Sequence, residues 1–228
     1  MNKILVVTPL VLEQSALAEY FETRGYAVEK PTEKTPVSVF PKLGLEVAVA
    51  GHGKAQFALV TQHLIDKRGP YDLVVIGGVA GGLRKDLDAG DVVVSTEIVE
   101  HDFKSRFEGD KPPPRFPCDP GFLEAIKAAQ TPDLGFTVHA GPIAGGDEDI
   151  IEANRAHQLH LDTDAICVAW EGGGGAKAAI FSGIPYIEVR AISDAADEEA
   201  VEHFHLNLKD AAKNVGRVLE PWLLGRKR

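Results

Sequence analysis

Buried-strand patterns alternate with helical patterns along the chain, and this alternation is what most restricts the fold. Continuous apolar runs rich in Val and Ile, as expected for strands covered on both faces, occupy residues 4–8, 46–50, 73–77, 91–95, 135–141, 165–169 and 186–191. Helical patterns lie between them, at about 10–24, 54–68, 120–130, 171–182 and 205–224. The order predicts a layered α/β fold.

The 228 residues are predicted to form one domain, residues 1–228. With 44% hydrophobic residues the chain can bury a substantial core, and no repeat or long linker divides it. The least organised stretch is 104–119, KSRFEGDKPPPRFPCD. Three consecutive prolines exclude a helix or an inner strand. The sequence therefore predicts a loop there that is either functional or mobile.

Charge and cysteine content exclude several classes of protein. The formal net charge of -10 argues against a nucleic-acid partner. Cys118 and Cys167 lie far apart and Cys167 falls in a strand pattern, so we expect a buried thiol and no disulfide framework. The apolar run in MNKILVVTPL is too short and too β-branched for a signal peptide or a membrane span. We expect a soluble cytoplasmic protein with no membrane partner.

Charged side chains follow two predicted strands, at the point where each strand ends. Arg190-Ala191-Ile192-Ser193-Asp194 follows the apolar run 185–189, and Trp170-Glu171 follows the run 165–169. Ligands of open α/β sheets bind beyond the carboxyl ends of the strands. Two carboxylates delivered there from different strands can carry out acid–base chemistry on a small molecule.

Two features near the N-terminus also follow strands. Glu13 stands near the start of a helix, where most glutamates are exposed, but its position close to a strand end favours a role in a site. Gly51-His52-Gly53-Lys54 lets the backbone turn tightly beside a ligand, although an ordinary strand–helix turn explains it equally well. The third glycine of a dinucleotide-binding fingerprint is absent.

Two glycine-rich segments suggest close backbone approach. The segment GGVAGG at 77–82 follows a strand and lacks the Lys-Ser/Thr of a P-loop, which disfavours a nucleoside triphosphate. Four glycines at 172–175 open a predicted helix, at a cost of about 0.5–1 kcal/mol each relative to alanine. That cost favours tight packing or a binding role, with a flexible turn as the alternative.

The histidines and serines give no second catalytic signal. The histidine pairs His157/His160 and His203/His205 have no third ligand at suitable spacing, so we expect solvated histidines, no metal and no cofactor. A Gly-x-Ser-x-Gly elbow is absent from the sequence, which argues against a serine hydrolase.

Five segments, taken in order, resemble the nucleoside phosphorylase/nucleosidase superfamily, and most of all its 5'-methylthioadenosine/S-adenosylhomocysteine nucleosidase branch. They read ILVVTPLVLEQ, GHGKAQFALV, DLVVIGGVAGGLRKDLDAGDVVVSTEIVEHDF, GGDEDI and VAWEGGGGAKAAIFSGIPYIEVRAISDAAD. The resemblance covers almost the whole chain. It implies a three-layer α/β/α fold around a twisted, mixed and mostly parallel sheet.

The resemblance also implies hydrolysis of the N-glycosidic bond of a purine nucleoside, with roles assigned by position. Asp194 would protonate N7 of the leaving purine, and Glu13 would orient and deprotonate the attacking water. Arg190 would help to hold that water and Glu13, while Glu171 would bind the ribose hydroxyls. The backbone near Ile150 would read the edge of the base. An acid paired with a water-activating carboxylate is the division of labour of inverting glycosidases, and it requires an acid whose pKa is raised.

Several substrate-binding positions depart from the family pattern. Trp170 replaces a methionine and can pack on the sugar, and Val79 replaces a serine. Asp149 stands where an aromatic residue normally stacks on the purine, and His52 stands where a small apolar residue lines the 5' pocket. Ser193, beside the proposed acid, is also expected to contact substrate.

The loop after residue 102 is expected to reach a neighbouring subunit. By resemblance, Lys104, Arg106 and Phe107 belong to the 5' pocket of the other subunit of a homodimer. Together with His52, the two cations suggest a polar or anionic 5' group, as in futalosine. The alternative is that Lys104 and Arg106 are solvated loop charges and that the loop phenylalanines fold back on their own chain.

Two other functions stay open at the level of sequence. Phosphorylases of the superfamily carry an arginine and a serine where this chain has Ile76 and Val79, so hydrolysis is favoured over phosphorolysis. A nucleoside-binding protein without catalysis would explain Val79, Asp149 and Trp170. It would not explain why both proposed catalytic carboxylates are present.

Overall fold

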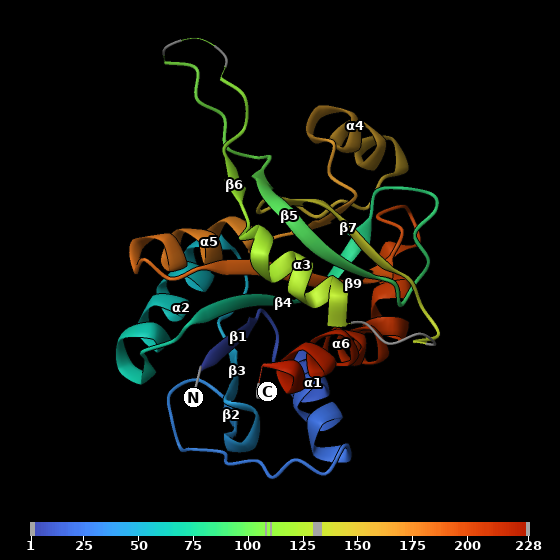
Figure 1. Cartoon of the computed structure of the whole chain (residues 1–228). Coiled ribbons are helices and arrows are strands. Elements are labelled where there is room, and N and C mark those ends of the chain that lie inside the picture. The colour runs from blue at the N-terminus through green and yellow to red at the C-terminus, as the bar shows by residue number, and fades with distance from the viewer. Residues whose placement is uncertain (1–2, 108, 110, 130–133, 227–228) are drawn as a thin grey trace.

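The computed structural model describes residues 3–107, 109, 111–129 and 134–226, in which nine strands form one mixed sheet with six α-helices around it (Figure 1). The strands are β1 (Ile4–Thr8), β2 (Val37–Phe40), β3 (Leu45–Val49), β4 (Leu73–Gly82), β5 (Val92–Glu100), β6 (Arg115–Pro117), β7 (Val138–Gly145), β8 (Cys167–Ala169) and β9 (Tyr186–Asp194). The helices are α1 (Val11–Thr23), α2 (Lys54–Arg68), α3 (Pro120–Ala129), α4 (Ala153–Thr163), α5 (Gly172–Phe181) and α6 (Ala200–Gly225), with a 3-10 turn at Pro41–Leu43.

Parallel pairing places several carboxyl ends at one edge of the sheet. β1 pairs in parallel with β3 and β4, and β4 pairs in parallel with β9. β7 pairs in parallel with β5 and β8, while β4 with β8 and β5 with β9 are antiparallel. Because β9 joins β4 to β5, the strands β4, β8, β7, β5 and β9 close into a ring.

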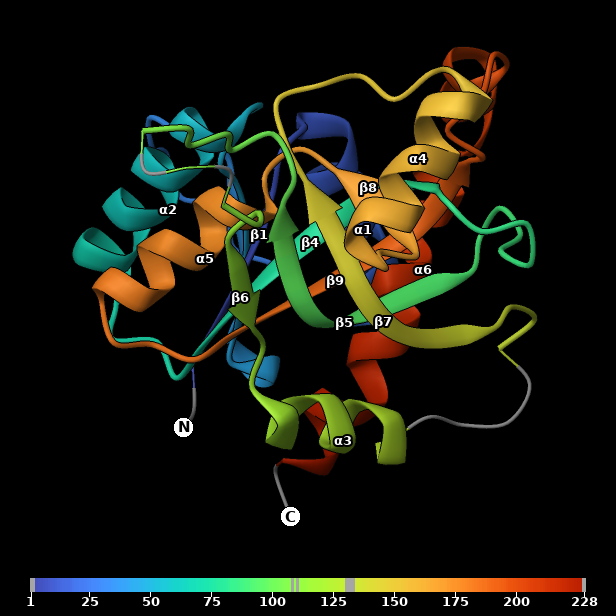
Figure 2. The same cartoon turned by 90° about the horizontal axis from the view of Figure 1, so that it is seen from above.

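Helices cover both faces of the central strands. α2 and α5 pack together on one side, and α1 and α6 on the other (Figures 1 and 2). Neighbouring residues of β4 show the two layers. The Ile76 side chain lies against Gly175 of α5, whereas Gly77 faces Val215 of α6. Successive side chains of a strand point to opposite faces of the sheet. Because helices cover both faces of β4, Ile76 is fully buried.

The structure confirms the α/β class and the mixed sheet with helices on both faces, and it changes several bounds. β4 continues through Gly82 and β9 through Asp194, whereas the predicted strands ended at residues 77 and 191. The first strand of the seven predicted coincides with β1. α4 and the short strands β2 and β6 were not predicted, and β6 closes the proline-containing loop as an edge strand.

Candidate active site

A cavity of about 400 Å³ opens at the carboxyl ends of β1, β4, β8 and β9. It brings together all ten of the catalytic and substrate-binding residues predicted within one subunit: Glu13, His52, Val79, Asp149, Ile150, Trp170, Glu171, Arg190, Ser193 and Asp194. Other lining residues include Leu10, Glu148 and Phe204, none of which the sequence singled out.

Glu13 is held in one orientation by two backbone groups. Its Oε2 accepts the N–H of Leu10 at 2.9 Å, and its Oε1 accepts the N–H of Val79 at 2.8 Å. The residue is 1% exposed. Burial raises the pKa of Glu13 to about 7, because desolvation outweighs the attraction of Arg190 and the two backbone hydrogen bonds. Its carboxyl group therefore changes charge near neutral pH.

Asp194 is the second carboxyl group of the cavity with a raised pKa. Ser193 Oγ donates to its Oδ2 at 2.7 Å, and the backbone N–H of Ala196 donates to its Oδ1 at 3.0 Å. Burial raises the pKa of Asp194, and these two hydrogen bonds only partly oppose that shift. Two carboxyl groups whose pKa values are raised in one cavity are the arrangement that acid–base chemistry requires.

Two glycines of β4 make room for these carboxyl groups. Gly78 has a φ of +145°, and a Cβ there would lie 2.7 Å from both Arg190 Nη1 and Glu13 Oε1. A Cβ on Gly81 would lie 2.9 Å from Asp194 Oδ1. The close backbone approach suggested by GGVAGG is thus made to the polar side chains of the site.

Arg190 lies fully buried among three carboxylates. Its Nε donates to Glu188 Oε1 at 2.8 Å, and its Nη2 donates to Glu171 Oε2 at 3.2 Å. Its Nη1 donates to the carbonyl of Val79 at 3.3 Å, beside Glu13. The carboxylates of Glu188, Glu171 and Glu13 raise the pKa of Arg190 despite its desolvation, so the guanidinium stays charged.

Sequence reasoning missed Glu188. A glutamate stands there in an otherwise apolar run, two residues before Arg190, and the period of a strand puts the two side chains on one face. That pairing was the available signal. Glu188 is 0% exposed, and its Oε2 has no hydrogen-bond partner among the described residues.

His52 and Trp170 form one wall of the cavity beside Glu171. Their ring centroids are 4.1 Å apart, with 33° between the ring planes. His52 Nδ1 lies 3.4 Å from Glu171 Oε1, which also accepts the backbone N–H of Gly53 at 3.4 Å. The turn predicted at 51–54 therefore contacts the carboxylate expected to bind a sugar.

Asp149 and Ile150 lie in the segment between β7 and α4. Asp149 is exposed and Ile150 is buried, and both line the cavity. The only aromatic residues lining it in the described part of the chain are His52, Trp170 and Phe204 of α6. Phe204 thus supplies a phenyl ring to a cavity in which Asp149 supplies none.

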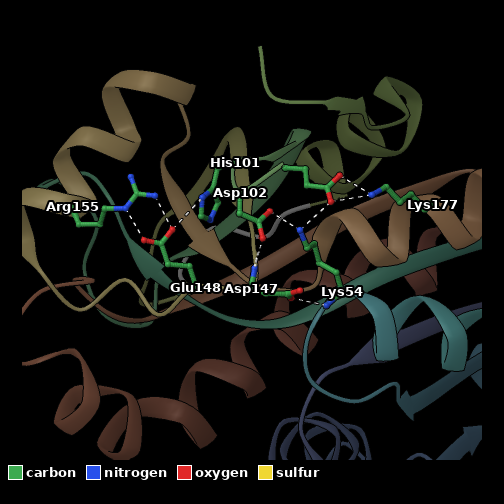
Figure 3. A network of polar contacts seen from close by, with 8 residues as sticks. Lys54, His101, Asp102, Asp147, Glu148, Arg155 and Lys177 are labelled. Atoms are coloured by element: carbon green, nitrogen blue, oxygen red, sulfur yellow. Dashed lines mark hydrogen bonds and ion pairs between the residues drawn. The ribbon is translucent and has the colours of Figure 1, made fainter. Parts of the chain in front are cut away.

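A polar network ties this segment to the start of α2 (Figure 3). Lys54 Nζ contacts Glu100 Oε1 at 3.0 Å and Asp102 Oδ1 at 2.5 Å, while Lys177 also binds Glu100. The Lys54 backbone N–H donates to Asp147 Oδ1, and the Asp147 backbone N–H donates to Asp102 Oδ2. Lys54 therefore anchors two wall segments at once, the turn carrying His52 and the segment carrying Asp149 and Ile150.

The residues predicted for a neighbouring subunit lie apart from this cavity. Lys104 and Arg106 line a separate cavity of about 460 Å³, together with His101 and Arg155. Phe107 is fully exposed. Their expected place in another subunit's pocket stays a prediction.

The described residues offer neither a membrane-spanning helix nor a metal site. No helix among them is long and apolar enough to cross a membrane. They also contain no group of three or more His, Cys, Asp or Glu side chains placed to hold a metal ion. Cys118 and Cys167 are both buried as free thiols.

The fold and the site define a family. Residues 3–223 match the model of the Phosphorylase superfamily, and the chain belongs to that superfamily. The 5'-methylthioadenosine/S-adenosylhomocysteine nucleosidase of Exiguobacterium sp. is 36% identical over 181 residues, which cover 75% of this chain and 76% of that protein.

Solved structures agree over nearly the full length. The 5'-methylthioadenosine/S-adenosylhomocysteine nucleosidase of Neisseria meningitidis, in complex with methylthio-immucillin-A, superposes with a TM-score of 0.86 at 28% identity and covers 99% of this chain and 100% of its own. Futalosine hydrolase of Helicobacter pylori gives a TM-score of 0.86 at 25% identity, with 98% of each chain covered.

Proposed function

We propose that this protein hydrolyses the N-glycosidic bond of a 5'-modified purine nucleoside of the methylthioadenosine or S-adenosylhomocysteine type. The observation that carries the proposal is the pairing of Glu13 and Asp194, two carboxyl groups with raised pKa values in one cavity. The similarity to nucleosidases supports it. The C1'–N9 bond breaks, its electron pair leaves with the purine, and water adds to C1'.

Asp194 is the general acid that protonates N7 of the purine as the bond breaks. Ser193 Oγ lies within reach of both Asp194 Oδ2, at 2.7 Å, and the carbonyl of Ala80, at 3.3 Å. When Asp194 is protonated, the serine hydroxyl can donate to that carbonyl and accept from the acid. The proton is thereby held in place until the purine takes it.

Glu13 is the base that takes a proton from water as it attacks C1'. Because two backbone N–H groups fix both of its oxygens, the carboxylate keeps one orientation toward the cavity. Arg190 lies beside it and stays charged. Glu171 accepts hydrogen bonds from the ribose hydroxyls, with Trp170 and His52 packed against the sugar. Val79 and the segment of Asp149 and Ile150 line the pocket around the base.

The charges of the cavity favour water over phosphate as the nucleophile. Of the described lining residues, Glu13, Glu148, Asp149, Glu171 and Asp194 carry carboxyl groups, whereas Arg190 is the only arginine and no lysine is among them. Arg190 already contacts Glu171 and Glu188. Among the described lining residues, a phosphate dianion would find no arginine or lysine that is not already paired with carboxylates. Hydrolysis therefore fits the site better than phosphorolysis.

Futalosine-type hydrolysis is the second candidate, supported by the similarity to futalosine hydrolase and by His52 at the cavity wall. Lys104 and Arg106 line a different cavity of their own chain, so they can meet an anionic 5' group only across a subunit boundary. We include a homodimer in the proposal, because exposed Phe103 and Phe107 offer apolar surface for a partner to cover.

Base release by the purified protein tests the proposal. The substrates are methylthioadenosine, S-adenosylhomocysteine, futalosine, adenosine and inosine, each with and without phosphate. We expect phosphate-independent release, fastest from the 5'-thio nucleosides. Faster release from futalosine would favour the second candidate, and release that depends on phosphate would make the protein a phosphorylase.

A further inference from the structure

Glu188 is a buried charged group of the site for which the proposed reaction has no direct use. Its side chain is fully buried behind Arg190 and does not line the cavity. Oε1 accepts the Arg190 Nε–H at 2.8 Å, while Oε2 has no hydrogen-bond partner among the described residues. A buried carboxylate with one unsatisfied oxygen is costly, so its presence calls for a physical explanation.

The surrounding structure is shaped to hold this carboxylate. The backbone N–H of Glu188 donates to Ser95 Oγ at 2.9 Å, which fixes the strand at this residue. A Cβ on Gly172 would lie 2.5 Å from Glu188 Oε2, so only a glycine leaves room for the carboxylate at the start of α5. This contact explains one of the four consecutive glycines, and it links Glu188 to the helix that begins directly after Glu171.

We infer that Glu188 is a positioning residue for the proposed hydrolysis, on which this inference rests. It holds the Arg190 guanidinium by Nε, so that the remaining N–H groups face Glu171 and the Glu13–Val79 contact. Its charge also offsets that of Arg190, and it thereby limits how strongly Arg190 attracts the Glu13 carboxylate. Glu13 and Arg190 both lie 2.7 Å from the point where a Cβ on Gly78 would stand, so the two groups are close enough to interact.

The charged groups around the cluster support this account. Glu13 faces Arg190 of β9, Glu171 before α5, and the backbone N–H groups of Leu10 and Val79. The pKa of Glu13 reaches about 7 even though Arg190 attracts its charged form. A guanidinium shared among three carboxylates cannot stabilise each of them fully.

Glu188 itself faces Arg190, Glu171 and two thiols. Burial raises the pKa of Cys118 to about 12 and raises that of Cys167 as well, so both thiols stay neutral. Burial also raises the pKa of Glu188, and Arg190 opposes this shift by charge and by hydrogen bond. His52 also contacts Glu171. Arg190 is the cation that Glu188, Glu171 and Glu13 share.

Two variants separate the charge of Glu188 from its hydrogen bond. Glu188→Gln keeps an oxygen that can accept the Arg190 Nε–H but has no charge, whereas Glu188→Leu removes both. In full-length protein with carbon-13-labelled glutamate carboxyl groups, NMR follows the Glu13 signal, identified by its loss in Glu13→Gln. We expect its titration midpoint to fall by about one pH unit in Glu188→Gln. The acidic limb of the kcat/KM profile, which reports the ionisation of Glu13, should shift to lower pH by the same amount.

Glu188→Leu should also lower kcat by at least about tenfold, because the guanidinium loses its anchor. Glu46→Gln is the matched control, since Glu46 is a buried glutamate paired with Arg68 away from the cavity. A Glu13 midpoint that stays in place in folded Glu188→Gln overturns the inference. The inference also fails if the NMR signal of Glu188 in the wild type shows a protonated carboxyl group over the pH range in which Glu13 titrates. This observation is made on the wild-type protein and does not require a Glu188 variant to fold.

The NMR titration does not depend on turnover. If wild-type protein releases no base but the Glu13 midpoint falls in Glu188→Gln, the proposed function fails while the electrostatic role of Glu188 stands. If the wild type hydrolyses nucleosides and the midpoint does not move, only the role of Glu188 fails.

Discussion

The backbone N–H of Val79 donates to Glu13 Oε1 at 2.8 Å and joins β4 to the start of α1 at the wall of the cavity. The contact comes from the main chain, so it does not depend on the side chain at position 79. The family resemblance of the sequence leads one to expect a serine at this position, and its replacement by Val79 was one reason to consider a protein without catalysis. Glu13 keeps its orientation without that hydroxyl.

We therefore expect Val79→Ser to change kcat/KM by less than about tenfold, equivalent to about 1.4 kcal/mol. The added hydroxyl lines the cavity, but it replaces no existing contact to Glu13. Steady-state assays of base release measure the change. A gain of several orders of magnitude would mean that Glu13 is poorly held in the wild type.

Activity should follow a bell-shaped pH profile. The reaction needs Glu13 ionised and Asp194 protonated, so turnover is lost at low pH and at high pH. Because the pKa of Glu13 is about 7, one limb of kcat/KM should fall near pH 7 in the free enzyme. A profile that is flat from pH 5 to pH 9 would contradict the assignment of these two carboxyl groups.

Gly78→Ala should destabilise the fold by more than about 2 kcal/mol and abolish turnover. A Cβ there meets both Arg190 and Glu13, at a φ that favours glycine. Gly25→Ala is the control, since Gly25 also has a positive φ but a Cβ there would meet nothing within 4 Å. Thermal unfolding of both variants separates the cost of the steric contact at Gly78 from the cost of the positive φ, which both positions share. Equal losses would show that the crowding at Gly78 is unimportant.

Lys54→Met should lower stability by roughly 1–3 kcal/mol and raise KM. Its ammonium group lies between Glu100 and Asp102, and the network around it holds the two wall segments of the cavity. Lys127→Met removes an exposed lysine that pairs with Glu124, and it should cost less than about 0.5 kcal/mol. Urea unfolding and substrate titration compare the two. A Lys54 variant that matches the Lys127 variant would contradict this role of the network.

Much of the fold could be predicted from the sequence because buried strands appear as continuous apolar runs with helical segments between them. Helix 54–68 was predicted with the bounds of α2. The segment 153–163 is polar overall and was not predicted as a helix; the buried residues of α4 are Ala156, Leu159 and Thr163. β2 and β6 are short strands whose pairing depends on distant partners, which no local pattern reports.

Residues of the candidate site could be predicted where they follow strands and where the family resemblance assigns a role to a position. What the sequence does not contain is the direction of each side chain. Phe204 reaches the cavity from α6, and Lys54 points away from it into the network with Glu100 and Asp102. Glu188 stands two residues before Arg190, so the strand period could have placed both side chains on one face, but only the structure shows the hydrogen bond between them.

The most direct test of the central claim is purine release from methylthioadenosine in phosphate-free buffer by the wild-type protein and by Asp194→Asn. Asp197→Asn, which changes a nearby aspartate that does not line the cavity, serves as the control. We expect many turnovers by the wild type, no response to added phosphate, and a loss of at least about 10²-fold in Asp194→Asn only, with its fold intact. Near-normal release by Asp194→Asn, or release that requires phosphate, would contradict the account.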